Sequence, residues 1–427
     1  MGAGVGQVET VAVLTNVPNA PKVPNVPKMP NEPNVPKVPK AAADLAQQWI
    51  IEQLRFDRAE RHAALSELPD WEQVVTFAPA ERLAELLLAS RAAEAFPLAV
   101  REQLEQIRLG TRARNGWLIK QLEEWLERFD AANIPTIVLK GAAMIALVYQ
   151  RPALRPMSDL DVLVRRADFE RAGELLRAAG FTRYRELGGT TESTLQTQSH
   201  WIHLTPPGTA LDLHWHVIDS GYYAHHVPIE WFWDHTQSVP LLARQMRVLT
   251  PEAQLLHLAA HLELHHAGGG LLALYDVAAL IHKLGGTMDW DLVLATATRF
   301  EWGQSLRRTV QRAQDVFGVS IPNAVRDRLA HLPTTWHERL VRALATPAAH
   351  PAVFVFDGWW QPGLRGKVRY WWRSLFPSAE FMQVHGPVRS DGELAWQYAL
   401  RLGRGVQRIP RALWAGITQM HQRRDGY

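Results

Sequence analysis

Leucine, alanine and charged residues recur at helical spacing near the start of the chain, over Ala41–Arg58 and Ala80–Glu94. A third stretch, Asn115–Phe129, repeats this pattern with six large apolar residues on one face: Trp117, Leu118, Leu122, Trp125, Leu126 and Phe129. Apolar residues at this spacing predict amphipathic helices whose apolar face is buried. We therefore expect residues 41–130 to be a helical region, with the third stripe in the core.

Short β-branched and apolar runs then replace the helical spacing. Ile134–Leu139 and Leu160–Val164 have the composition of buried strands, and Ala167–Ala179 has the pattern of a helix that ends at Gly180. Further along, two alternating runs predict a hairpin: Trp201–Leu204 and Leu211–Val217, joined by the turn residues Pro206, Pro207 and Gly208. These elements predict a small core of mixed sheet and helices in residues 131–248.

Helical spacing returns after the predicted core and continues to about Val319. Thr250 and Pro251 are typical of an N-cap and a first helical turn. We expect a second helical region in residues 249–320 and a mixed region, rich in Trp and Arg, in 321–427. At the other end of the chain, Val17–Lys40 is a proline repeat, which predicts an extended, disordered tail over residues 1–40. A spacer or a ligand for a proline-binding module is the alternative to a dispensable tail.

Composition narrows the class of protein. The chain has 427 residues, of which 47% are hydrophobic and 21% charged, a globular mixture. It has no cysteine, which excludes disulfides, thiolate metal sites and cysteine nucleophiles and fits a cytoplasmic protein. We find no run of about 18 apolar residues and no signal-peptide pattern. A net charge of +3 is a weaker basic bias than nucleic-acid binders often show.

Two carboxylates carry the first candidate chemistry. In the run SDLDVLV, Asp159 and Asp161 are two residues apart on a predicted strand, so their side chains point to one face. Adjacent carboxylates raise one another's pKa unless a cation neutralises them. Mg²⁺ binds one or two carboxylates together with substrate phosphates. The alternative is a solvated strand edge, because a lone D-x-D is a weak signal.

Other residues add to this pattern. Asp212 alternates with apolar residues in ALDLHW, and it shares a face with His214 and His216. A third acid on a neighbouring strand would complete a two-metal clamp. Lys140 and Gly141 lie where a strand turns into a helix, a place where backbone amides can contact a phosphate. Lys140, together with Arg155, could neutralise a triphosphate.

The combination of IPTIVLKGAA, RPMSDLDVLV and LDLHW resembles the uncharacterised nucleotidyltransferase family of the polymerase-β-like superfamily. The resemblance extends to LTPEAQLLHLAAH and YDVAAL and covers most of residues 45–400. It implies an α+β fold, in which a small mixed-sheet nucleotidyltransferase core has flanking helical regions.

The resemblance also implies a function. The expected activity is Mg²⁺-dependent transfer of a nucleoside monophosphate from a nucleoside triphosphate such as ATP to a hydroxyl acceptor, with release of pyrophosphate. Two Mg²⁺ ions would be held by Asp159, Asp161 and Asp212, and Asp212 could act as base. Lys140, Gly141, Arg155 and Ser158 would contact nucleotide or phosphate. The acceptor is unidentified, with a small molecule, peptide or glycan favoured over nucleic acid. Ala142 stands where the superfamily commonly has serine, which leaves open a catalytically silent nucleotide-binding or regulatory protein.

Two further patterns remain open. His257, His261 and His265 recur at every fourth position, with His266 adjacent and Asp276 beyond, so a histidine–aspartate metal hydrolase is a third reading. The alternative is a helix whose imidazoles line the same site, near His200 and His203 as well as His214 and His216.

Arg and aromatic residues alternate in 368–373 and 401–414. They predict either a surface that contacts nucleic acid or a membrane peripherally, or a packed helix with a solvated basic face.

Overall fold

The computed structural model of the chain describes residues 40–57, 70–184, 197–241, 244–377 and 390–422, together with Ala379 and Met382. The proline-rich tail predicted to be extended lies outside the described residues, apart from Lys40, the first residue of helix α1.

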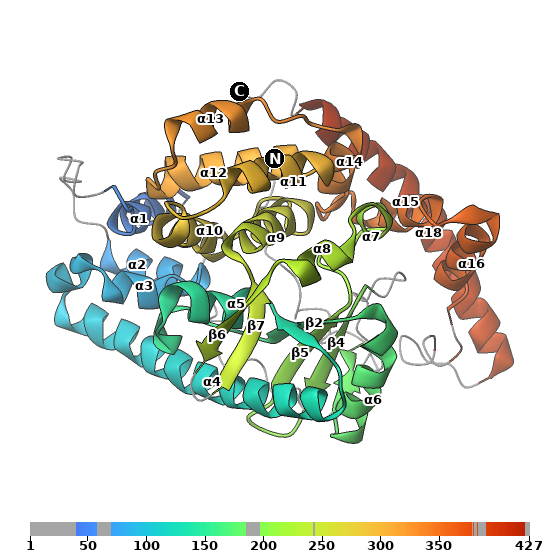
Figure 1. Cartoon of the computed structure of the whole chain (residues 1–427). Helices are drawn as coiled ribbons and strands as arrows, with labels where there is room; N and C mark the ends of the chain where they lie inside the picture. Colours follow the sequence, from blue (N-terminus) through green and yellow to red (C-terminus); the bar gives the residue numbers. More distant parts are fainter. Residues whose placement is uncertain are drawn as a thin grey trace.

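One mixed sheet lies at the centre of the fold (Figure 1). The described residues form seven strands in the order β3-β4-β5-β2-β1-β7-β6. Their bounds are β1 Thr136–Val138, β2 Leu160–Val164, β3 Thr182–Arg183, β4 Gln198–His203, β5 Thr209–His214, β6 Thr236–Leu241 and β7 Arg244–Leu249. β2 runs parallel to β5, and β1 runs parallel to β7; the other neighbours are antiparallel.

The predicted strands and hairpin are therefore confirmed, and so is the α+β fold class. β6 and β7, which were not predicted, form a second hairpin at one edge of the sheet. β6 contains Pro240, which cannot donate to a neighbouring strand and is tolerated at a sheet edge. The weak alternation of this strand explains why the sequence pattern did not reveal it.

Helices α4 (Leu98–Ala131) and α6 (Phe169–Ala178) pack on the sheet (Figure 1). The apolar stripe of α4 is buried as predicted, except for Trp117, which is half-buried and donates from Nε1 to Thr209 Oγ1 at 3.0 Å. The prediction of one helix over Ala80–Glu94 is wrong. Helix α2 (Trp71–Ala80) ends at the first residue of this range. A separate helix, α3 (Ala84–Ala89), follows and leads into a 3₁₀ turn.

Backbone conformation explains the broken helix. Arg82 has a φ of +60°, a left-handed conformation that no helix continues through. Ser90 is extended, and its hydroxyl accepts from the amide of Ala92 to begin the 3₁₀ turn. Propensity alone favoured a single helix, and the contacts of the folded chain, such as that of Arg82 with the carbonyl of Pro156, override it.

A second layer of helices packs beside the sheet and shares one hydrophobic core with α1 and α2. It comprises α9 Pro251–Leu264, α10 Leu271–Leu284, α11 Trp290–Arg299, α12 Gly303–Phe317, α13 Asn323–Ala330 and α14 Trp336–Leu344, and α1 spans Lys40–Gln53. The predicted cap is confirmed: Thr250 accepts a hydrogen bond from the amide of Ala253, and Pro251 lies in the first turn of α9. Two short helices, α7 (Tyr223–His226) and α8 (Ile229–Asp234), connect β5 to β6.

The described part of residues 321–427 is helical. After α14 it contains α15 (Val353–Trp359), α16 (Gly363–Leu375) and the long α18 (Asp391–Gln422), which lie along one side of the molecule (Figure 1). A search of the described helices finds none that is long and apolar enough to cross a membrane.

Asp357 of α15 is a buried acid that connects this side of the molecule to the loop after β5. Its side chain accepts a hydrogen bond from the amide of Gly221 at 2.7 Å, and the residue is only 2% exposed. Burial raises the pKa of Asp357 to about 8, and the nearby Asp219 adds to the shift.

We expect Asp357 to make the protein less stable as the pH rises. The pKa is higher in the folded chain than in the unfolded one, so this contribution to stability is complete below about pH 4 and falls steadily as the pH rises from there to about 8. Asp357→Asn should therefore raise the free energy of unfolding at pH 9 by about 1–3 kcal/mol, with little effect at pH 4. Thermal unfolding across this range tests it, with Asp327→Asn on the exposed side of α13 as control. Equal pH dependence in wild type and variant would contradict it.

Candidate active site

Three carboxylates meet where β2 lies beside β5. Asp161 of β2 is directly opposite Asp212 of β5 in the parallel register. Asp159 lies in the bend just before β2, two residues from Asp161 and close enough for the charges of Asp161 and Asp212 to act on it. The structure thus brings together the three acids that the sequence singled out.

Basic side chains surround these carboxylates. Lys140 Nζ is 2.7 Å from Asp161 Oδ1, and His214 Nε2 is 3.1 Å from the same oxygen. From β4, on the far side of β5, His200 Nδ1 lies 2.6 Å from Asp212 Oδ1. Oxygen and nitrogen atoms of Asp161, Asp212 and His214 all lie within 4.8 Å of one another, close enough to hold a metal ion.

The charges of the site affect the three acids differently. Burial raises the pKa of Asp159 to about 6, and the negative charges of Asp161 and Asp212 contribute to this shift. Burial would also raise the pKa of Asp161, but Lys140 and His214 outweigh it and hold this pKa below its usual range. Asp161 is therefore ionised at neutral pH, while Asp159 is the acid that an additional cation would stabilise most.

Lys140 and Gly141 form the turn between β1 and the short helix α5 (Lys140–Met144). Lys140 has a φ of +46°, a left-handed conformation that is strained for a residue with a side chain and is common at functional sites. Gly141 is buried, and a Cβ atom there would lie 2.5 Å from Arg155 Nη1 and 3.1 Å from Met157 Cγ. Glycine at this position makes room for the Arg155 guanidinium.

Gly141→Ala is expected to destabilise the protein by about 1–3 kcal/mol, because the added methyl group overpacks the turn. Gly116→Ala is the matched control: Gly116 lies inside α4 with open space around it, so alanine should stabilise by about 0.5–1 kcal/mol. Thermal unfolding of both variants measures the difference. The same shift in both variants would show that the crowding at Gly141 has no energetic consequence.

Arg155 and Ser158, predicted to contact phosphate, have protein partners. Arg155 Nη2 is 2.8 Å from Asp276 Oδ2 of α10, and Tyr149 donates to Asp276 Oδ1 at 2.7 Å. Ser158 Oγ donates to Asp159 Oδ1 at 3.0 Å. Asp276 therefore belongs to this network, whereas the hydrolase reading would have used it beside the histidines of α9.

Two arginines that no sequence pattern predicted lie near the site. Arg114 of α4 donates to the carbonyls of Gly208 at 2.6 Å and Ser158 at 3.2 Å, and Arg82 donates to that of Pro156 at 2.8 Å. Burial lowers the pKa of both arginines, and the charge of Asp159 opposes the shift in both. Both guanidinium groups thus lie close to the carboxylates, although no local motif marks them.

His203 and His216, the other two histidines close to the motif in the sequence, contact groups other than the carboxylates. His216 is buried and contacts the backbone oxygens of Ile218 and Val227 at 3.1 and 3.2 Å, while the ring of His203 packs on Phe181. Of the four histidines near the motif, His200 and His214 are the two that contact the carboxylates directly.

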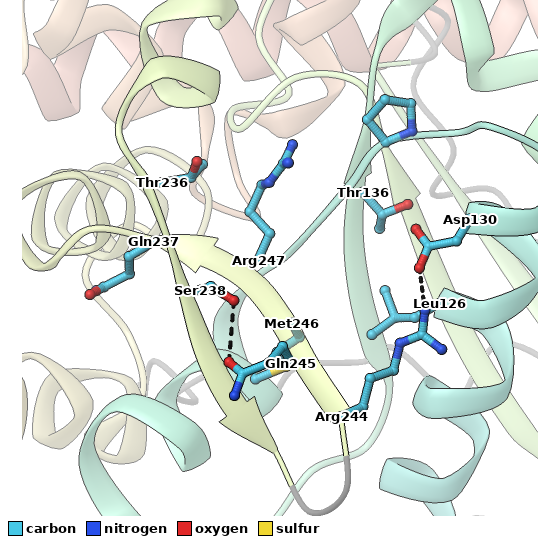
Figure 2. A pocket seen from close by; sticks show the side chains of 11 residues that line it. Leu126, Asp130, Thr136, Thr236, Gln237, Ser238, Arg244, Gln245, Met246 and Arg247 are labelled. Carbon is cyan, nitrogen blue, oxygen red and sulfur yellow. Dashed lines mark hydrogen bonds and ion pairs between the residues drawn. The ribbon is translucent and has the colours of Figure 1, made fainter.

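A pocket of about 320 Å³ lies near the β6 edge of the sheet, between α4 and the β6–β7 hairpin (Figure 2). Arg244 and Asp130 form an ion pair there, and Ser238 donates to Gln245 at 3.2 Å. None of the three carboxylates lines this pocket. It is therefore separate from the candidate active site.

The paired acids on adjacent strands and the glycine turn agree with the nucleotidyltransferase resemblance predicted from the sequence. The model of the family described as uncharacterised nucleotidyltransferase matches residues 67–318, and the chain belongs to this family. Among solved structures, an antigenic nucleotidyltransferase-like protein from Paracoccidioides brasiliensis is 14% identical, with a TM-score of 0.31. That match covers 52% of this chain and 96% of the other. No curated protein matches the chain.

Proposed function

We propose that this protein transfers a nucleoside monophosphate from a nucleoside triphosphate to a hydroxyl acceptor, with Mg²⁺ as cofactor and pyrophosphate as the second product. The observation that supports this most directly is the register of β2 and β5, which sets Asp161 opposite Asp212 with Asp159 two residues away. Nucleotidyl transfer needs such a cluster of acids, because metal-bound phosphates must be held in line with the attacking oxygen.

The donor atoms fit magnesium. One oxygen of each acid is engaged, by Ser158, Lys140 and His200 respectively. The second oxygen of each has no hydrogen-bond partner in the described part of the chain. Carboxylate oxygens are the ligands Mg²⁺ prefers, so Asp159, Asp161 and Asp212 would hold the ions. When bound, Mg²⁺ would offset the negative charge on the phosphates.

The protein's own groups have separate roles in this proposal. The acceptor hydroxyl attacks the α-phosphorus, a new P–O bond forms, and the bond to the β-phosphate breaks. Asp212 takes the hydroxyl proton, and His200, at 2.6 Å, keeps this carboxylate in place. Lys140 orients Asp161 and adds positive charge beside the triphosphate.

The second candidate function is nucleotide binding without transfer. Ala142 is only 3% exposed inside α5, and it offers no hydroxyl to a phosphate. Ser158 is the nearest hydroxyl in the motif, but it donates to Asp159. A site with its acids intact and its phosphate turn altered would still bind a nucleotide and could serve as a regulatory protein.

Calorimetric titration with ATP, GTP, CTP and UTP in the presence of Mg²⁺ tests the proposed site. We expect at least one nucleotide to bind wild type and to lose most of its affinity in Asp159→Ala/Asp161→Ala. Asp234→Ala, an exposed acid on α8, is the control and should bind normally. Unchanged affinity in the double variant would contradict the site. Binding that leads to no pyrophosphate release with any acceptor would favour the silent alternative.

Contact with an anionic membrane surface is a further part of the proposal. On α16, Leu364, Val368 and Trp372 recur every fourth residue and are 55–76% exposed. α18 carries a second exposed apolar stripe of Trp396, Val406, Trp414 and Ile417. α16 contains no acidic residue, and α18 contains none after Glu393. The basic residues beside the stripes are Arg365, Lys367, Arg369, Arg373, Arg401, Arg404, Arg408 and Arg411. Exposed apolar stripes flanked by basic residues are typical of helices that lie in a membrane interface.

Sedimentation with lipid vesicles measures this contact. We expect binding to phosphatidylglycerol vesicles and little binding to phosphatidylcholine. Trp372→Ser/Trp414→Ser should weaken it by roughly 10-fold, because two aromatic anchors are lost. Leu98→Ser on α4, which removes a residue that is 71% exposed, is the control. Equal binding of the double variant and wild type would contradict the membrane surface.

A further inference from the structure

The end of helix α9 gathers three imidazole rings that the proposed transfer does not use. His261 and His265 are one turn apart, and His266 follows directly. We propose that His261, His265 and His266 form a second metal centre, which binds a divalent transition ion of the Zn²⁺ class and is distinct from the carboxylate site.

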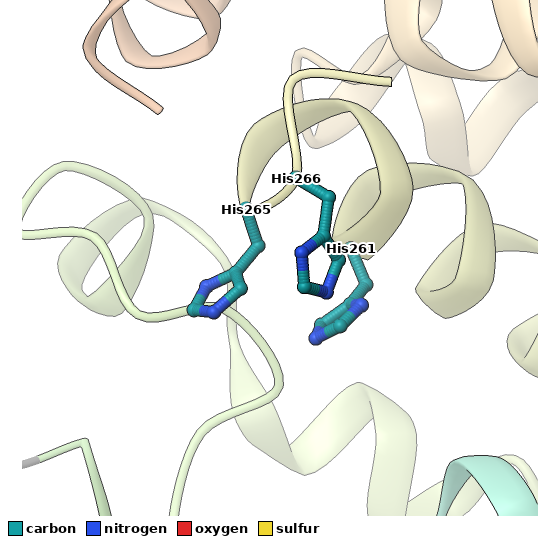
Figure 3. A group of neighbouring side chains, drawn as sticks. All are labelled: His261, His265 and His266. Carbon is teal, nitrogen blue, oxygen red and sulfur yellow. The ribbon is translucent and has the colours of Figure 1, made fainter. Parts of the chain in front are cut away.

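The rings are close enough to share an ion. One nitrogen of each lies within 4.8 Å of the others. The rings of His261 and His265 stack with centroids 4.9 Å apart, and the ring of His266 stands across that of His261 at 4.7 Å. Figure 3 shows the three side chains turned toward one another at the end of the helix.

The backbone at the end of α9 creates this arrangement. Spacing of four residues places His261 and His265 on one helix face. The chain then turns sharply: Ala267 and Gly268 have φ values of +50° and +84°, and the Gly268 amide donates to the carbonyl of Leu262 at 2.7 Å. His266 lies beside the other two rings because its amide donates to the carbonyl of His261 at 3.3 Å, five residues back, a spacing that a regular α-helix does not have.

The nitrogen atoms are also available. None of the three side chains makes a hydrogen bond or an ion pair to another residue of the described chain. His265 and His266 are exposed, and His261 is half-buried, so an ion can reach the cluster from solvent. The exposed rings can rotate to bring their nitrogens closer around an ion, because they pack against one another and are not locked by hydrogen bonds.

The ligand chemistry separates the two centres. Three imidazoles and one open position are typical of zinc sites that bind water or substrate oxygen, whereas Mg²⁺ prefers carboxylates. His257, one turn before His261, is fully buried, and within the described residues neither of its ring nitrogens has a hydrogen-bond partner. Burial and then the charge of Lys140 lower the pKa of His257 to about 3. Lys140 is the partner of Asp161, so the helix that carries the imidazole cluster also passes near the carboxylate site.

Equilibrium dialysis of the full chain against Zn²⁺, in a large excess of Mg²⁺, tests the proposal. Wild type should retain one Zn²⁺ per chain. His265→Ala/His266→Ala should weaken binding by at least about 100-fold, since loss of outer-shell groups alone costs 10–100-fold. Co²⁺ in place of Zn²⁺ should give visible absorption bands that the double variant lacks. Circular dichroism checks that both proteins are folded.

Two further variants separate this centre from the proposed active site. His331→Ala/His350→Ala removes two exposed histidines elsewhere and should leave Zn²⁺ binding unchanged. Asp161→Asn/Asp212→Asn removes the carboxylates and should also retain Zn²⁺. Binding that is lost in the aspartate variant but kept in the histidine variant would overturn the proposal, as would absence of Zn²⁺ binding by wild type. Neither result depends on nucleotidyl transfer, so the two proposals fail independently.

Discussion

Replacing Asp161 by asparagine is expected to reduce nucleotidyl transfer by at least about 10³-fold, which corresponds to about 4 kcal/mol of transition-state stabilisation. Asp161 contacts Lys140 and His214 and faces Asp212 across the parallel strands. The amide keeps the shape of the side chain but removes the charge that a metal ion requires. Asp212→Asn should have an effect of the same order, since each acid is needed for the same charge cluster.

Pyrophosphate release in single-turnover conditions measures this loss once a nucleotide and an acceptor are found. Asp130→Asn is the control, because Asp130 pairs with Arg244 at the separate pocket of Figure 2. Circular dichroism checks that the aspartate variants remain folded, because Asp161→Asn leaves the Lys140 ammonium without its ion-pair partner. Activity of Asp161→Asn within 10-fold of wild type would show that this acid does not hold the cofactor.

Local spacing was enough to predict the acids. Asp159, Asp161 and Asp212 are recognisable because strand residues alternate between two faces, and the apolar residues between them mark the core side. The hairpin and the Thr250 cap were predictable for the same reason, as each depends on residues close in the sequence. That the acids meet depends on the parallel pairing of β2 and β5, which the spacing alone did not show; the family resemblance implied only that the three acids hold metal together.

Contacts between distant segments could not be predicted in this way. Arg155 looks like a free phosphate ligand in the motif, but Asp276, 121 residues away, pairs with it. Arg82 and Arg114 reach the site from the N-terminal helical region. The apolar spacing of that region predicts which helix faces are buried, but not which polar side chains contact a distant segment. The left-handed φ of Arg82, which breaks the predicted helix, depends on tertiary packing that propensity does not contain.

Glu263 is a fully buried charge within the helical layer. It lies on α9 with its side chain fully buried, and three arginines surround it. Arg342 of α14 donates to it and is itself 7% exposed, while Arg308 and Arg312 of α12 lie 3.4 and 3.5 Å away and are about one-third exposed. The carboxylate therefore ties three helices together through one charge.

Glu263→Gln is expected to destabilise the protein by about 3–5 kcal/mol, the cost of leaving one member of a buried pair uncompensated. Urea unfolding followed by circular dichroism measures this, and Glu230→Gln, from an exposed pair with Arg165, should change the stability by less than about 1 kcal/mol.

A second variant tests the cause of this loss. Glu263→Gln/Arg342→Met removes both buried charges and should recover much of the stability. A double variant no more stable than Glu263→Gln would show that the loss comes from packing rather than from the unpaired arginine. Because Glu263 lies between His261 and His265 on the same helix, loosening of α9 in the single variant should also weaken Zn²⁺ binding. Recovery of both properties in the double variant would show that the charge network holds the imidazole cluster in place.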